Sequence, residues 1–154
     1  MNYVRKNMIK AVFDTTVFVS AFLNSLFPEG GLSLELFRFA QSNQFRLYIA
    51  EPILEEARRI LLEEERIRKK YSYTSDDVEE FLQSLRLVSY FIESIPNIFI
   101  IERDPDDNKI IACALAIQAD YLVTRDLDLL DIGLYQGIKI VKPEYFIRLI
   151  RESK

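Results

Sequence analysis

Short apolar runs alternate along the chain with longer amphipathic stretches. The runs are rich in β-branched and aromatic side chains and nearly uninterrupted by polar residues, which is typical of strands buried on both faces. They predict five strands, at Lys10–Phe13, Phe45–Ile49, Ile98–Ile101, Tyr121–Thr124 and Ile138–Val141.

The stretches between these runs place apolar residues three or four positions apart, as on one face of an α-helix. They predict helices that begin near Val17, cover Gly31–Ser42 and Pro52–Lys69, and carry apolar positions from Val78 to Ile92 after a cap at Thr74 or Ser75. Two more helices begin at Pro105, with Asp104 as cap, and at Pro143, because proline is favoured at the first helical position.

Strand–helix–strand alternation predicts an α/β fold, with a mostly parallel five-stranded sheet covered by helices on both faces. The length of 154 residues fits one three-layer domain over residues 1–154. Met8 would also serve as a start, so residues 1–8 are a candidate N-terminal extension.

Composition narrows the chemistry. The chain has one cysteine, Cys113, which lies in an apolar run and reads as a core residue, and it has no histidine. Ser-His and Cys-His nucleophilic pairs and histidine zinc sites are therefore excluded, and metal chemistry would depend on oxygen ligands, which favour Mg²⁺ or Mn²⁺. The net charge of −4 argues against a protein that simply coats nucleic acid. We expect a cytoplasmic protein with no membrane partner, since no signal-peptide core or membrane-spanning run is evident.

Acidic residues recur where the predicted strands end. Asp14 follows the first strand, Asp126 and Asp128 follow the fourth, and Asp107 stands in the short acidic run after the third. The helix after the second strand carries Glu55 and Glu56 in its first turns. Because the carboxyl ends of parallel strands meet at one edge of a sheet, these side chains are expected to converge there.

Each of these acids alone also has an ordinary structural interpretation. Asp14 or Thr15 could cap a helix, Asp126 or Asp128 could cap a short helix through Leu130, and Glu56 could be a surface charge. Several caps in one crevice would repel one another, however, and a divalent cation would remove that repulsion. Convergence therefore favours a metal site.

Four segments together resemble the acidic motifs of PIN-domain ribonucleases, in family order and spacing. They are Ala11–Ala21, Glu51–Glu56, Asp104–Ala114 and Leu122–Asp126. The likeness is greatest to the VapC-like group, the toxin components of toxin–antitoxin pairs. It implies the PIN fold and an acidic catalytic tetrad of Asp14, Glu56, Asp107 and Asp126. Glu55 is the rival of Glu56 for the second place.

The resemblance also implies roles for the residues around the tetrad. Asp14, Asp107 and Asp126 would hold Mg²⁺ or Mn²⁺, and Glu56 would orient or deprotonate the attacking water. The supporting residues would be Thr15, Thr16, Asp104, Thr124 and Asp128, with Thr16 standing where the family commonly has Asn or Ser. Independently of the resemblance, four basic residues lie near the tetrad in the sequence and are candidates for RNA contact: Arg58, Arg59, Lys109 and Arg125. They fit equally well as solvated helix charges paired with Glu63, Glu64 and Glu65. A second basic cluster consists of Arg66, Arg68, Lys69 and Lys70.

The function implied is metal-dependent hydrolysis of RNA phosphodiester bonds by an endoribonuclease toxin. Its partners would be the RNA substrate, a cognate antitoxin protein and a second copy of the chain. The apolar helix Val78–Ile95 is a candidate dimer surface and equally a candidate part of the intramolecular core. The alternative is a catalytically quiet PIN-like domain that binds RNA or protein.

Overall fold

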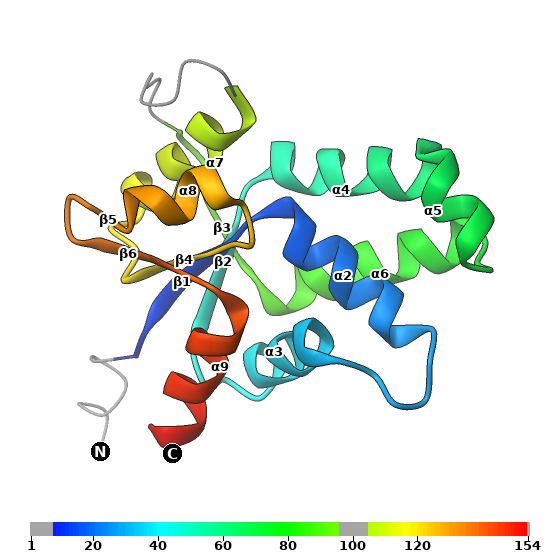
Figure 1. Ribbon diagram of the computed structural model, residues 1–154, viewed down its shortest axis with the longest axis horizontal. Helices are drawn as coiled ribbons and strands as arrows, with labels where there is room; N and C mark the ends of the chain where they lie inside the picture. The colour runs from blue at the N-terminus through cyan, green and yellow to red at the C-terminus, as the bar shows by residue number, and fades with distance from the viewer. Residues whose placement is uncertain (1–7, 96–104, 154) are drawn as a thin grey trace.

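In the residues that the computed structural model describes, 8–95 and 105–153, six strands form one sheet in the order β3-β2-β1-β4-β6-β5 (Figure 1). All neighbouring strands are parallel except β5 and β6. The strands are β1 (Lys10–Phe13), β2 (Arg46–Ile49), β3 (Tyr90–Phe91), β4 (Tyr121–Val123), β5 (Leu134–Tyr135) and β6 (Ile138–Val141). In the central register Val12 of β1 lies between Tyr48 of β2 and Leu122 of β4.

Helices cover both faces of the sheet, as the sequence predicts. Figure 1 shows α7 and α8 on one side and α3 and α9 on the other, with α2, α4 and α6 packed together beyond one edge. The helices are α2 (Thr15–Ser25), α3 (Leu32–Gln41), α4 (Glu51–Glu63), α5 (Glu65–Lys70), α6 (Ser75–Val88), α7 (Pro105–Ala116), α8 (Leu127–Ile132) and α9 (Pro143–Glu152).

The structure confirms the predicted α/β class and corrects the number of strands. The described residues contain six strands rather than five, because β3 and β5 were not predicted. Each is two residues long, too short to give an apolar run. β5 pairs with β6 through Gln136 and Gly137, which both have positive φ, as tight hairpin turns require. The strand predicted at Ile98–Ile101 lies outside the described residues.

The helix predicted to reach Ile92 ends earlier. Thr74 caps α6 in a reciprocal capping box with Asp77, and the helix stops at Val88. Beyond it the Ile92 N–H donates to the Ile49 carbonyl at 2.9 Å, which extends the pairing of β3 with β2. Ile92 is buried like the helical residues, so helical spacing included it although its backbone is extended.

The apolar face of α6 belongs to the core. Val78, Phe81, Leu82 and Leu85 are all at most 9% exposed, so they do not form a dimer surface. The long helix predicted over Pro52–Lys69 is also interrupted, because the extended Glu64 separates α4 from α5. The predicted amphipathic faces are thus correct, whereas two helix boundaries are wrong.

The sheet is buried between the helical layers. Residues 11–13 of β1 and 121–123 of β4 are buried throughout, and Phe146 of α9 packs its ring against Phe13, Phe45 and Tyr121. Cys113 is buried in α7, and this burial raises the pKa of its thiol to about 11, consistent with an inert core residue. In the described part of the chain, no helix has the length and apolar character needed to cross a membrane.

Candidate active site

The order in which successive strands are added to the sheet reverses between β1 and β4. From β1 the strand order runs to β2 and β3 on one side and to β4 and β6 on the other. The carboxyl ends of strands at such a switch point form a natural crevice. Asp14 follows β1 and Thr124 follows β4, and the Asp14 N–H donates to the Val123 carbonyl at 2.9 Å. The sheet itself therefore brings these two loops together.

A hydrogen-bonded network joins Asp14 to Asp126 through Thr124. Thr124 is fully buried; its Oγ1 donates to Asp14 Oδ2 at 2.7 Å and accepts the Asp126 N–H at 3.0 Å. Asp126 Oδ1 accepts the Asp128 N–H at 2.8 Å and so caps α8. The network fixes the position of both acidic residues relative to the sheet.

Asp14 is not used as a side-chain helix cap. It stands at the N-cap position of α2 without a side-chain capping hydrogen bond of normal geometry. Burial raises the pKa of Asp14 above its usual range, and the nearby negative charge of Asp126 acts in the same direction, while hydrogen bonding to Thr124 and Thr16 opposes the rise. The fold thus keeps a partly buried carboxylate beside a second one.

The side chains of Glu56 and Glu55 lie in different surroundings. Glu56 lies on the wall of the cleft that contains Asp14 and forms an ion pair with Arg59. Glu55 is more exposed and pairs with Arg58, whose guanidinium also bonds Glu79 of α6. Of the two rival glutamates, Glu56 is the one that lines the cleft.

The cleft has a volume of about 160 Å³ and opens at the carboxyl ends of β1 and β4. Its lining contains acidic side chains and Lys109 of α7, and apolar residues of α4 and α7 complete the walls. We call it the acidic cleft; its lining residues are Asp14, Thr15, Thr16, Pro52, Ile53, Glu56, Ile60, Lys109, Ile110 and Asp126.

Sequence reasoning missed the apolar walls of the acidic cleft. Ile53 and Ile60 read as core positions of α4, and Ile110 as a core position of α7. A signal was present, because Ile53, Glu56 and Ile60 are spaced by three and four residues and so share one face of α4. Glu56, an acidic residue between two apolar ones on this face, indicates that this side of α4 lines the cleft.

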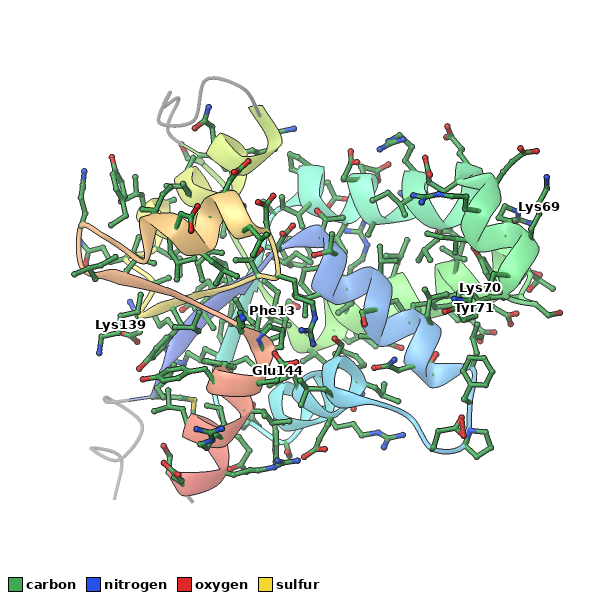
Figure 2. The ribbon with its side chains drawn as sticks, in the orientation of Figure 1. Phe13, Lys69, Lys70, Tyr71, Lys139 and Glu144 are labelled. Atoms are coloured by element: carbon green, nitrogen blue, oxygen red, sulfur yellow. The ribbon has the colours of Figure 1, made fainter. Side chains whose placement is uncertain are left out.

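Other predicted residues lie beside the cleft or away from it. Arg125 pairs with Glu144 of α9, and Arg58 is held between Glu55 and Glu79, so neither lines the acidic cleft. Asp128 is exposed in the first turn of α8. Figure 2 shows Lys69 and Lys70 of the second basic cluster at the far end of the α4–α5 arm, away from the sheet.

The third acidic motif is described in part. Asp104 lies outside the described residues, and Asp107 belongs to the first turn of α7 with its side chain outside the described part of the structure. Lys109 and Ile110 of the same helix line the acidic cleft. Among the described residues, no three acidic side chains form a group that could hold a metal ion.

The described donors nevertheless fit a hard cation. Asp14, Asp126 and the nearby threonine hydroxyls are oxygen ligands, the kind that Mg²⁺ and Mn²⁺ prefer. Asp126 raises the pKa of the partly buried Asp14, so the pair carries an electrostatic cost that a bound cation would remove.

A family comparison agrees with this architecture. The family model described as "PIN domain" matches residues 10–128, a span that includes β1, the acidic cleft and the cap of α8. A separate comparison with curated proteins found no match.

Proposed function

We propose, from the premise that this chain belongs to the PIN-domain family, that it is a metal-dependent endoribonuclease that hydrolyses RNA phosphodiester bonds. PIN domains are typically nucleases that use divalent metal ions and act on nucleic acid. RNA as the substrate, and Mg²⁺ or Mn²⁺ as the ion, are the specific parts of the proposal.

One observation carries the proposal more than any other. The partly buried carboxylate of Asp14 accepts a 2.7 Å hydrogen bond from Thr124 and lies close enough to Asp126 for the second charge to raise its pKa. Two carboxylates held this close together lower the stability of the folded protein unless a bound cation offsets their charge. Perturbed carboxylates in a cleft are a common mark of a functional site.

In this proposal Asp14, Asp107 and Asp126 hold the ion. When bound, Mg²⁺ or Mn²⁺ supplies Lewis-acid stabilisation of charge on the phosphate and makes water a better nucleophile, so no histidine base is needed. Thr124 keeps the Asp14 carboxylate oriented and ionised through its donated hydrogen bond.

Glu56 and Lys109 line the same cleft and would act on the substrate. The Glu56 carboxylate orients the attacking water and accepts its proton. The Lys109 ammonium contacts a phosphate oxygen. Arg59 forms an ion pair with that carboxylate.

The proposal is tested by incubating a mixed cellular RNA pool with the protein and Mn²⁺ or Mg²⁺. We expect metal-dependent cleavage that Asp14→Asn and Asp107→Asn abolish. Equal cleavage by the wild type and these variants would identify a contaminating nuclease and overturn the proposal. Retained RNA binding without any cleavage would instead support a binding module.

Neighbouring glutamates on α4 provide a matched pair of variants. Glu56→Gln removes a carboxylate from the cleft wall and is expected to reduce the cleavage rate by about 10²–10⁴-fold, the usual effect of losing a general base. Glu55→Gln makes the same chemical change outside the cleft, where it weakens the ion pair with Arg58, and should leave the rate within about twofold. Equal effects of the two substitutions would remove Glu56 from the mechanism.

The resemblance to VapC-like proteins extends the proposal to a toxin that a cognate antitoxin restrains and that forms homodimers. Expression of the wild-type chain should then arrest growth of a bacterial host, while expression of Asp14→Asn should not. Sedimentation equilibrium tests the dimer directly. Growth arrest by both proteins would contradict the toxin assignment without touching the nuclease assignment.

A further inference from the structure

Two adjoining hollows lie beside the acidic cleft, on the side of α9. The first has a volume of about 470 Å³ and is lined by Arg125, Leu127, Lys142 and Glu144. The second, of about 350 Å³, shares Lys142 and Glu144 with the first and continues along α9; its other lining residues are Leu130, Ile140, Val141, Tyr145 and Arg148. We call the two together the basic groove.

The groove is connected to the acidic cleft through the backbone. Arg125 of the groove directly precedes Asp126 of the cleft. The Thr124 N–H donates to the carbonyl of Val141, another groove residue, at 3.0 Å. An extended ligand that leaves the acidic cleft past Asp126 therefore meets the basic groove next.

The charge of the groove is opposite to that of the cleft. Its lining includes the cations Arg125, Lys142 and Arg148 against one acid, Glu144. Arg125 already pairs with Glu144 at 2.9 Å, and Figure 2 shows Glu144 at the start of α9. Lys142 and Arg148 remain as two exposed cations on the groove wall, whereas the described lining of the cleft carries a net negative charge.

An aromatic ring and an apolar floor lie between these cations. Tyr145 is 49% exposed and is one helical turn from both Lys142 and Arg148. The centroid of its ring lies 6.5 Å from that of Tyr121, and its 49% exposure leaves ring surface available to a ligand. Leu127, at 71% exposure, adds an apolar surface where α8 begins.

Cations alternating with an aromatic ring match the chemistry of single-stranded nucleic acid. The ammonium and guanidinium groups contact successive phosphates, and a base stacks on the exposed ring. An acidic protein segment would use the cations but has no use for a stacking platform.

We propose that the basic groove binds the single-stranded RNA that flanks the phosphodiester in the acidic cleft, with a base on Tyr145 and phosphates at Lys142 and Arg148. This inference rests on the proposed ribonuclease function. It adds the surface that the flanking strand contacts and the direction in which the strand leaves the cleft. Arg125 reaches the strand by exchanging its Glu144 partner for a phosphate.

The test measures binding separately from cleavage. Fluorescence anisotropy with a labelled 20-nucleotide oligouridylate in EDTA reports RNA binding without cleavage. The variants are Arg148→Ala, Lys142→Ala with Arg148→Ala, and Tyr145→Leu. Arg38→Ala, which removes an exposed arginine from α3, is the matched control.

Counterion release sets the expected size of the effect. Each lost phosphate contact lowers the salt slope of log K by about 0.7 for single strands. We expect Arg148→Ala to weaken binding about 5-fold at 0.1 M salt, and the double variant about 25-fold with a slope lower by about 1.4. Tyr145→Leu should weaken binding about 5-fold or more with an unchanged slope, because stacking releases no counterions.

Each outcome separates this inference from the proposed function. Loss of binding in the groove variants but not in Arg38→Ala supports the groove, even if the wild type cleaves nothing with Mn²⁺. Unchanged binding in all variants overturns it, even if the wild type is an active nuclease. Equal binding of duplex and single-stranded RNA overturns the substrate class. Binding of a polyglutamate peptide in place of the oligonucleotide overturns the choice of RNA.

Discussion

Thr124 links the Asp14 carboxylate to the backbone of Asp126 at the acidic cleft, and loss of its hydroxyl gives the sharpest test of the site. The side chain is fully buried, with Oγ1 2.7 Å from Asp14 Oδ2 and 3.0 Å from the Asp126 nitrogen. Thr124→Val preserves the shape of the side chain but removes the hydroxyl. One carboxylate oxygen and one backbone N–H then lose this partner.

The expected loss in the free energy of unfolding follows from the two hydrogen bonds that Thr124 makes. A hydrogen bond to a charged group contributes about 1.5–3 kcal/mol to stability, and a neutral one about 0.5–1.5 kcal/mol. We therefore expect Thr124→Val to lower the free energy of unfolding at pH 7 by about 2–4 kcal/mol. Thr124→Ser keeps the hydroxyl and loses one buried methyl group, which should cost about 1 kcal/mol.

A double-mutant cycle with Asp14→Asn isolates the charged bond. Asn keeps an acceptor oxygen but no charge, so the cost of Thr124→Val in that background should fall by about 1–2 kcal/mol. Urea denaturation at pH 7 of the wild type, the two single variants and the double variant measures this coupling energy. The same loss should reduce metal-dependent RNA cleavage by about 10–100-fold, as for other residues that orient ligands.

The reasoning fails in either of two cases. Equal destabilisation by Thr124→Val and Thr124→Ser would mean that the hydroxyl contributes nothing beyond packing. A coupling energy near zero with Asp14→Asn would mean that Thr124 does not act through the Asp14 charge.

Three further predictions follow from other parts of the structure. Burial holds the pKa of Asp14 above its usual value, so ionisation of this carboxyl group opposes folding at neutral pH. Asp14→Asn should therefore raise the free energy of unfolding by about 0.5–2 kcal/mol at pH 7 while abolishing cleavage. A lower urea midpoint for this variant would contradict the prediction. Phe146 is fully buried against three other aromatic rings, so Phe146→Ala should cost about 3–5 kcal/mol, and a thermal midpoint within 3 °C of the wild type (roughly 1 kcal/mol or less) would refute that packing. The Tyr73 hydroxyl donates a hydrogen bond to the Leu61 carbonyl at 2.6 Å, and burial raises the pKa of this hydroxyl. Tyr73→Phe should therefore lower the free energy of unfolding by about 1 kcal/mol at pH 7. That cost should shrink as the pH rises through the raised pKa of the folded state, and a constant difference in urea midpoints between pH 7 and pH 11 would exclude it.

The sequence alone determined the order of the layers and the edge at which chemistry would be found. Uninterrupted apolar runs require burial on both faces, so β1, β4 and β6 could be placed within a residue of their observed bounds. Pro143 and Thr74 mark helix starts through strictly local chemistry, namely a missing N–H and a capping hydroxyl. Parallel strands then bring Asp14 and Asp126 to one edge, because every strand in such a sheet ends on the same side.

Tertiary structure decided what depends on contacts between distant segments. Consecutive helical residues point about 100° apart, so the choice between Glu55 and Glu56 depended on how α4 packs, with Arg58 joining Glu55 to Glu79 of α6. The role of Thr124 required a partner 110 residues away. β3 formed because Tyr90 and Phe91 found β2 as a neighbour, although their spacing also suited a helix. Local patterns encode which residues seek burial or a cap, whereas pairings across the fold depend on the packed geometry that all of the elements create together.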